Sequence, residues 1–102
     1  MMTATEPSEI LFAPARLVTD TRLDFRRAGL EHVERAVQDM APRIYVDLAA
    51  TKDIDASGLG VLVLLQKRAR EKMIAMRLLG AGASVRQMLL LTKLDYLFEL
   101  DD

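Results

Sequence analysis

The spacing of hydrophobic residues changes repeatedly between a period of two and a period of about 3.6, which predicts alternating strands and helices. In the segment from Arg43 to Leu48, Ile44, Val46 and Leu48 would share one face of a strand. The segment from Ala75 to Leu79 is a second short hydrophobic run with the composition of a buried strand. Weaker strand patterns occur at Glu9 to Phe12, Ala15 to Val18 and Tyr96 to Leu100.

A first helix is predicted from Thr21 to about Met40. Thr21 and Asp24 have the spacing of a capping box, in which each side chain binds a backbone amide of the first turn. Pro42 ends the helix because proline lacks the backbone N–H. His32 falls among charged residues, so we expect a solvated histidine. The stripe expected to face the core consists of Leu30, Val33, Val37 and Met40.

The last predicted helix follows a turn at Gly80 to Gly82 and ends near Leu94. Ser84 and Gln87 have the spacing of a capping box at its start. After the final strand, Asp101 and Asp102 are expected to form a solvated tail. The hydrophobic positions of this helix are Val85, Met88, Leu89 and Leu91.

With a further helix in the middle of the chain, the predicted order is β, β, α, β, α, β, α, β. Such alternation favours a single α/β domain with a mostly parallel sheet, and right-handed crossovers leave few possible topologies. Residues 1–8 are polar and contain one proline, so we expect a disordered or frayed start. The domain itself is expected to span residues 9–102.

The middle helix, predicted from Ser57 to about Met73, has hydrophobic residues on two sides. Val63 and Leu64, with Gly60, fall on the side that carries the charged residue Lys67. They could be covered by another element or be ordinary exposed residues, or they could form a docking patch for a protein. Gly60 favours docking, because glycine inside a helix costs about 1 kcal/mol relative to alanine. The side expected to face the sheet consists of Gly58, Leu62, Leu65, Ala69 and Met73.

Ser57, at the predicted start of this helix, has two possible roles. Serine is a favoured N-cap, so a purely structural role is one interpretation. A helix N-terminus also favours anions, so a phosphate on Ser57 could be accommodated there. Phosphorylation would place roughly −1.5 to −2 charges beside Asp55 and near the hydrophobic residues, and could thereby release a bound partner.

Composition narrows the possible functions. The chain has 102 residues, 51% of them hydrophobic, which fits one globular domain. A net charge of −1 with both signs mixed gives no basic face of the kind that binds nucleic acid. The absence of cysteine excludes disulfides and thiolate chemistry. No clustered acids, metal ligands or nucleophile–base pair indicate an enzyme, a metal site or a cofactor.

The segment Asp55-Ala56-Ser57-Gly58-Leu59-Gly60, after a strand ending in Val46-Asp47-Leu48, resembles the signature of the STAS domain family. Bacterial anti-anti-sigma factors (anti-sigma factor antagonists) are the most similar group, with the usual motif Asp-Ser-Ser-Gly-Leu-Gly. The resemblance covers Ile44 to Leu100 well and Glu9 to Met40 only in pattern. It implies one mixed, mostly parallel sheet with helices mainly on one face.

The resemblance also implies a partner switch. An anti-sigma factor that is also a serine kinase of the GHKL type would bind the unphosphorylated domain and phosphorylate Ser57. A phosphatase of the PP2C type would reset it. With the exposed positions of the helix added, the predicted partner-binding residues are Asp55, Ala56, Gly58, Leu59, Gly60, Val63, Leu64 and Lys67.

Two positions depart from the family pattern. Ala56 replaces a first serine, which leaves Ser57 as the one hydroxyl of the motif. The Gly-x-Leu-Asp often found at the end of the second strand reads Ala15-Arg16-Leu17-Val18, so its aspartate is missing unless Asp20 or Asp24 replaces it. Thr51 is a second hydroxyl upstream of the motif and is interpreted as a plain loop residue.

The sequence therefore predicts a cytoplasmic, non-enzymatic binding module of a sigma-factor partner switch. It would act as a monomer or weak dimer, without cofactor, direct nucleic-acid contact or membrane insertion. The alternative is a STAS subunit that is not phosphorylated, such as an accessory subunit of an ABC-type lipid transporter or part of a signalling scaffold. In that case Ser57 would be only a cap.

Overall fold

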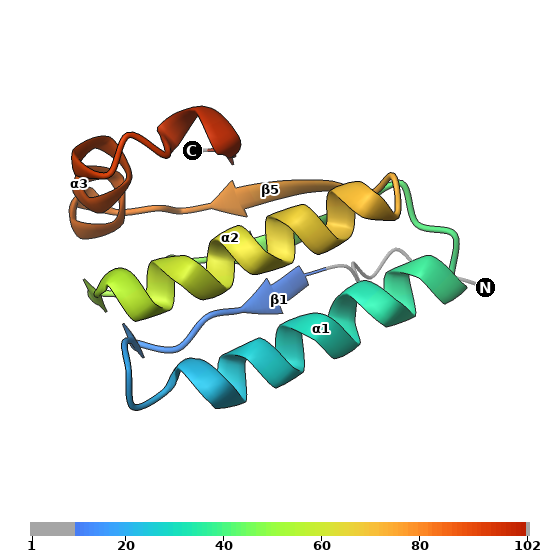
Figure 1. Cartoon of the computed structure of the whole chain (residues 1–102), viewed down its shortest axis with the longest axis horizontal. Coiled ribbons are helices and arrows are strands. Elements are labelled where there is room, and N and C mark those ends of the chain that lie inside the picture. Colours follow the sequence, from blue (N-terminus) through green and yellow to red (C-terminus); the bar gives the residue numbers. More distant parts are fainter. Residues whose placement is uncertain (1–9, 102) are drawn as a thin grey trace.

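In the computed structural model, which describes residues 10–101, strands and helices alternate as the hydrophobic pattern predicts (Figure 1). The strands are β1 (Ile10–Phe12), β2 (Arg16–Leu17), β3 (Arg43–Asp47), β4 (Asp53–Ile54), β5 (Ala75–Leu79) and β6 (Glu99–Asp101). The helices are α1 (Arg22–Gln38), α2 (Ala56–Glu71) and α3 (Ala83–Leu91), followed by the short 3₁₀ helix η1 (Asp95–Leu97). Residues 1–8, predicted to be frayed, lie outside the described residues.

The main sheet has the strand order β1-β3-β5-β6, and every pair in it is parallel. Successive strands are thus added in one direction, and right-handed crossovers then place the connecting helices on the same face. Figure 1 shows α1 and α2 lying side by side across the sheet. The predicted α/β class with a mostly parallel sheet is confirmed.

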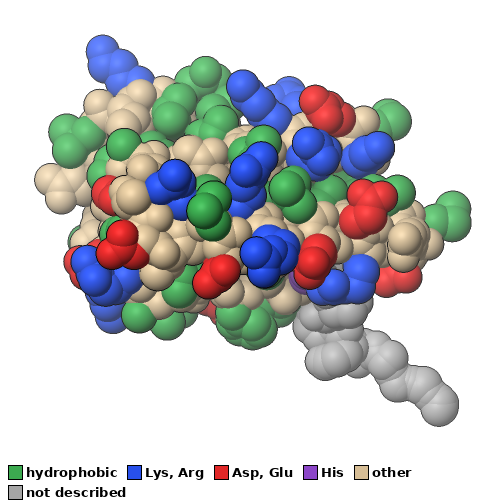
Figure 2. Space-filling view, turned by 60° about the horizontal axis from the view of Figure 1, so that its bottom comes forward, with side chains coloured by type: hydrophobic (Ala, Val, Ile, Leu, Met, Phe, Trp, Pro, Cys, Tyr) green, Lys and Arg blue, Asp and Glu red, His purple; other side chains and the backbone are tan. Residues whose placement is uncertain are grey.

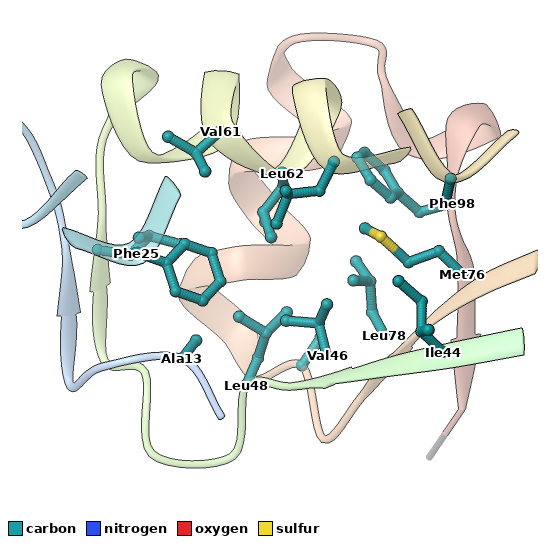
Figure 3. Close-up of a cluster of buried hydrophobic side chains, with 14 of the residues drawn as sticks. Ala13, Phe25, Ile44, Val46, Leu48, Val61, Leu62, Met76, Leu78 and Phe98 are labelled. Atoms are coloured by element: carbon teal, nitrogen blue, oxygen red, sulfur yellow. The ribbon is translucent and has the colours of Figure 1, made fainter. Parts of the chain in front are cut away.

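The core fills the space between this sheet and the two long helices (Figure 3). In β3, Ile44 and Val46 point into it, opposite Met76 and Leu78 of β5, as the two-residue period predicts. From α2 the predicted stripe is confirmed by four buried residues, although Met73 is 90% exposed. Met73 lies after the helix with a φ of 61°, so the helical period no longer places it. The four buried residues are Gly58, Leu62, Leu65 and Ala69.

The buried stripe of α1 is rotated from the predicted one. His32 is buried, so the prediction of a solvated histidine is wrong, and the predicted core residue Met40 is 88% exposed after the helix end. The rotation follows from Gly29, because a Cβ there would lie 2.5 Å from the Leu65 side chain. Glycine thus lets α1 approach α2 closely along this line. The buried residues of α1 are Phe25, Gly29, His32, Val33 and Ala36.

Neither predicted capping box forms. The Thr21 hydroxyl instead donates to the Arg16 carbonyl oxygen at 2.7 Å and accepts from the Val18 amide at 3.0 Å, closing the turn between β2 and α1. At α3 the N-cap is Gly82, and Ser84 lies within the first turn. Side-chain spacing alone does not decide which backbone amide a hydroxyl reaches when a preceding turn offers another partner.

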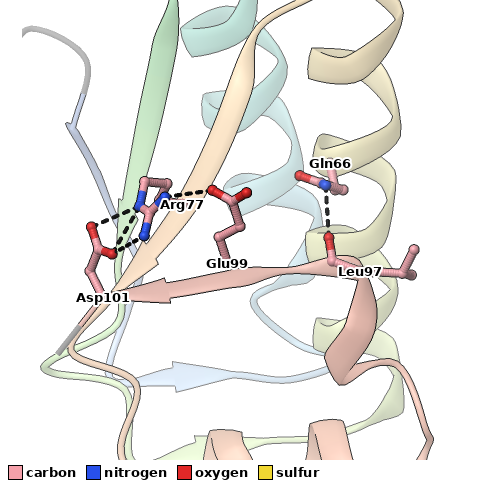
Figure 4. A network of polar contacts seen from close by, with 5 residues as sticks. All are labelled: Gln66, Arg77, Leu97, Glu99 and Asp101. Carbon is pink, nitrogen blue, oxygen red and sulfur yellow. Dashed lines mark hydrogen bonds and ion pairs between the residues drawn. The ribbon is translucent and has the colours of Figure 1, made fainter.

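The end of the chain differs from the predicted strand at Tyr96 to Leu100. Residues 95–97 form η1, which the Gln66 side-chain amide anchors by donating to the Leu97 carbonyl oxygen at 2.8 Å (Figure 4). Strand β6 follows, and Arg77 of β5 pairs with Glu99 and Asp101 on the sheet face away from the core (Figure 4). Asp101, predicted to be solvated tail, is therefore part of the sheet.

Two further short strands form outside the main sheet. After β1 the chain bends, and β2 pairs in parallel with β4, joining Arg16 to Asp53 and Leu17 to Ile54. The hydrophobic pattern gives no sign of β4, because a strand of two residues has too few positions to show a period. This pairing brings the loop after β2 against the first turn of α2.

Candidate functional site

The candidate site lies at the carboxyl end of the parallel strands, where β4 leads into α2. In Figure 1 the strand arrows point toward the end of the molecule at which α1 and α2 begin. Asp55 is the N-cap of α2, and its carboxylate accepts a hydrogen bond from the Gly58 amide at 2.9 Å. The predicted cap, Ser57, is instead the second residue of the helix. Asp55 thus satisfies the cap, and the Ser57 hydroxyl is not required for it.

Thr19, in the loop between β2 and α1, holds this cap from the other side. Its amide donates to the Asp55 carboxylate at 3.1 Å, and its hydroxyl oxygen lies 3.2 Å from the same carboxylate oxygen. The Thr19 hydroxyl also lies 3.1 Å from the Ser57 hydroxyl. Thr19 and Ser57 are 38 residues apart in sequence, and the pairing of β2 with β4 brings them together.

The sequence prediction missed Thr19, although a signal was present. The family motif places an aspartate at the end of the second strand, and the corresponding position here is Val18. Thr19, one residue later, is the residue of this loop that contacts Asp55 and Ser57. Neither Asp20 nor Asp24 forms a hydrogen bond with Ser57 in the part of the chain that the structure describes, so neither replaces the missing aspartate through a direct contact.

The electrostatics of the site favour the ionised form of Asp55. The Gly58 amide, followed by the amide and hydroxyl of Thr19, lowers the pKa of the Asp55 carboxyl below its usual value. A neighbouring cation, Arg22, donates from Nη1 to the Thr19 carbonyl oxygen at 3.2 Å. The site therefore combines the hydrogen-bonded carboxylate of Asp55, the hydroxyls of Thr19 and Ser57, and the guanidinium of Arg22.

The two glycines of the motif, Gly58 and Gly60, differ in the space around them. A Cβ on Gly58 would lie 2.0 Å from the Leu17 carbonyl oxygen, so glycine is required for β2 to approach α2. A Cβ on Gly60 would meet no atom within 4 Å, and Gly60 is exposed. No contact among the described residues therefore explains the glycine at position 60.

The other predicted partner-binding residues separate into exposed and covered positions. Leu59 is buried, and Val63 is half-buried against the core, so the interpretation of Val63 as an outward side chain is wrong. Because Leu59 is buried like Gly58, its side chain does not form surface. The remaining positions follow one side of α2, which we call the outer stripe: Ala56, Gly60, Leu64 and Lys67. Its members are exposed except Leu64, which is half-buried.

Thr51 lies in a loop, as predicted, but its side chain has a structural role there. It is buried, and its hydroxyl donates to the Pro14 carbonyl oxygen at 2.8 Å, which fastens the loop before β4 to the bend after β1.

On the α1 side of the molecule, acidic and basic side chains are interspersed with scattered hydrophobic ones (Figure 2). Among residues 10–101, no three potential metal ligands of the His, Cys, Asp or Glu type cluster, and no helix is long and apolar enough to cross a membrane.

We predict opposite effects for alanine at the two glycines. Gly58→Ala should destabilise the domain by about 1–3 kcal/mol, because the new methyl group meets backbone rather than a movable side chain. Gly60→Ala should stabilise it by up to about 1 kcal/mol through helix propensity alone. Urea denaturation of both variants measures these changes. Equal effects of the two substitutions would contradict the different packing of these positions.

We also predict a pH-dependent contribution from Asp55. Since folding lowers the pKa of its carboxyl, the stabilisation is fully present above the ordinary pKa of an aspartate and is lost as the pH falls through the lowered one. Asp55→Asn keeps an N-cap of similar shape without the charge. The melting temperature of the wild type should exceed that of Asp55→Asn at pH 7, and the difference should shrink below about pH 4. A difference that stays constant between pH 7 and pH 3 would contradict it.

Comparison with solved structures supports the fold. A crystal structure of the protein TM1081 from Thermotoga maritima, described as a proposed anti-sigma factor antagonist, matches with a TM-score of 0.76 and 21% identity over 92% of this chain and 80% of that one. An NMR structure of TM1081 matches with a TM-score of 0.73 and 22% identity, covering 91% and 72%. A sulfate transporter family protein from Wolinella succinogenes matches with 0.61 and 14% identity, covering 97% and 81%.

Comparison by sequence gives the family. No protein with a curated description matches the chain significantly. The family model of the STAS domain matches residues 8–102, which include all the strands and helices described above and the segment from Asp55 to Gly60. The chain therefore belongs to the STAS domain family.

Proposed function

We propose that this STAS domain is an anti-sigma factor antagonist that is switched by phosphorylation of Ser57. In the unphosphorylated form it would bind an anti-sigma factor that is also a serine kinase of the GHKL type, and so free a sigma factor. A phosphatase of the PP2C type would restore this form. The domain would act in the cytoplasm as a binding module rather than as an enzyme.

The proposal rests on one observation: the Asp55 carboxylate caps α2, and the Ser57 hydroxyl does not. A serine that capped α2 would contribute about 1 kcal/mol to stability through its hydroxyl, and phosphorylation would change that capping group. Here the Asp55 carboxylate holds the Gly58 amide, and the half-buried Ser57 hydroxyl contacts Thr19 at the rim of the site. A phosphoryl group can therefore be added to Ser57 without removing the N-cap.

The outer stripe of α2 supports a docking surface beside Ser57. Ala56 and Gly60 are the smallest residues of the stripe and lie nearest to the serine, so a partner can approach the helix backbone there. Leu64 offers a partly exposed hydrophobic side chain one turn further, and Lys67 a positive charge after it. Phosphate on Ser57 would add negative charge at the edge of this surface and weaken binding by repulsion and desolvation.

A second function remains open on the same fold. The likeness to a sulfate transporter family protein indicates that this architecture also occurs in transport proteins. An accessory STAS subunit of a transporter, or part of a signalling scaffold, would use the outer stripe for constitutive docking. Its binding would be insensitive to modification of Ser57, which separates it experimentally from the antagonist.

We predict that an anti-sigma factor kinase from the same genome, with ATP, adds one phosphoryl group to the chain at Ser57. Intact-mass and peptide mass spectrometry measure the incorporation and its position. Ser57→Ala should abolish it while changing stability by no more than about 0.5 kcal/mol, since Asp55 provides the cap. Thr19→Ala is the matched control, because it removes the neighbouring hydroxyl and leaves the acceptor. Incorporation that persists in Ser57→Ala would contradict the assignment.

We predict that Leu64→Glu weakens binding of the same kinase by at least about tenfold, because it places a charge in the docking surface. Met73→Glu is the matched control, since Met73 is 90% exposed and lies after the far end of α2. Titration calorimetry of both variants measures the affinities, and melting temperatures show whether each is folded. Equal affinities of the two folded variants would exclude the outer stripe as the binding surface.

A further inference from the structure

A phosphate on Ser57 would lie beside the carboxylate that caps the N-terminus of α2. The Asp55 carboxylate accepts from the Gly58 amide and from the Thr19 amide, and the Leu59 amide donates to the Asp55 carbonyl oxygen. The phosphate would therefore have the Asp55 anion beside it. A doubly charged group in this position needs a cation to offset the repulsion.

Thr19 connects Ser57 to such a cation. Its hydroxyl oxygen lies 3.1 Å from the Ser57 hydroxyl oxygen, while its carbonyl oxygen accepts from Arg22 Nη1 at 3.2 Å. Thr19 thus contacts both the Arg22 guanidinium and the Ser57 hydroxyl. The long arginine side chain can swing from the carbonyl to a phosphate placed on Ser57, because only one hydrogen bond holds it.

Among residues 10–101, Arg22 also has no ion pair that would compete with a phosphate. No carboxylate of the described residues lies within ion-pair distance of it, whereas Arg16, on the adjoining strand β2, pairs with Asp53 at 3.4 Å. Arg22 is the first residue of α1, where the helix dipole disfavours a positive charge. Helix stability therefore does not explain an arginine at this position.

We propose that Arg22 binds the phosphate of phosphorylated Ser57 and so forms an intramolecular phosphate site between the start of α1 and the start of α2. This inference rests on the proposed function, since it concerns the phosphorylated form of the same serine. Arginine can offer two parallel N–H donors to phosphate oxygens, which the single contact to Thr19 does not use. The pair of Arg22 and the phosphate would lie over the loop at Thr19 and beside the outer stripe. Its bulk would obstruct a partner there, in addition to the charge repulsion.

The test uses a chain with phosphoserine installed at position 57 during translation, so that no kinase is required. The pKa of the phosphate is measured by ³¹P NMR titration in about 0.15 M salt. Arg22→Gln should raise this pKa by about one pH unit, because a cation beside the phosphate favours the doubly charged form. Arg22→Lys should raise it less, since the charge remains and the parallel donors are lost.

Arg70→Gln is the matched control. Arg70 is an exposed residue near the other end of α2, about 20 Å from Ser57 by helix rise, which exceeds the screening length of about 8 Å. It should leave the phosphate pKa unchanged. Comparison with the control also removes the constant influence of Asp55 and Asp20, the acidic groups on the capping and loop segments at the site.

The proposal is overturned if Arg22→Gln titrates like the wild type, or if Arg70→Gln shifts the phosphate pKa equally. Either result concerns Arg22 alone and leaves phosphorylation by a kinase untouched. Conversely, absence of kinase-dependent incorporation at Ser57 would refute the proposed function without changing the titration. Proton NMR spectra of each variant show that it is folded, and Arg22→Lys supplies the test if Arg22→Gln is not.

Discussion

The hydrogen bond from the Gly58 amide to the Asp55 carboxylate is the interaction on which the site depends. It begins α2 one residue before the motif serine and leaves the Ser57 hydroxyl outside the cap. The same carboxylate accepts the amide of Thr19, so a single side chain fixes both the start of the helix and the loop that faces it. The geometry around Ser57 is therefore set by a group that phosphorylation does not modify.

The position of this cap is fixed by close backbone packing between β2 and α2. Strand β2 pairs with β4 over only two residues, yet it brings the Leu17 carbonyl against the first turn of α2, where only glycine fits. Gly29 has a corresponding role where α1 crosses Leu65. The first contact holds β2 against the start of α2, and the second holds α1 against the middle of α2. The contrast with Gly60, which packs against nothing, marks the one motif glycine that faces outward.

The hydrophobic pattern predicted the presence of helices and strands better than the residues at which they begin and end. Strand β5 and the buried stripe of α2 follow the prediction, because burial on one face leaves a regular pattern. The caps and the strand β4 do not follow it, whereas the short strands β1 and β2 form within the predicted ranges. The Thr21 hydroxyl serves a turn rather than the helix, and β4 is too short to show alternation. His32 was misplaced because Gly29, not a large hydrophobic residue, occupies the closest point of helix contact.

The candidate site was predicted in part. The motif resemblance pointed to Ser57 and Asp55, but local sequence could not decide which of the two caps α2, since both serine and aspartate are good caps. Thr19 and Arg22 were missed because their relation to Ser57 depends on the pairing of β2 with β4, which joins segments far apart in the chain. Long-range contacts of this kind leave no periodic signal.

We propose that phosphorylation of Ser57 lowers the affinity of an otherwise intact domain for its partner. The most direct measurement compares the dissociation constants of the unmodified chain and the chain with phosphoserine at position 57 for an anti-sigma factor kinase from the same genome. We expect the phosphorylated chain to bind at least about tenfold more weakly, with its fold unchanged. Equal dissociation constants for the two folded forms would contradict it.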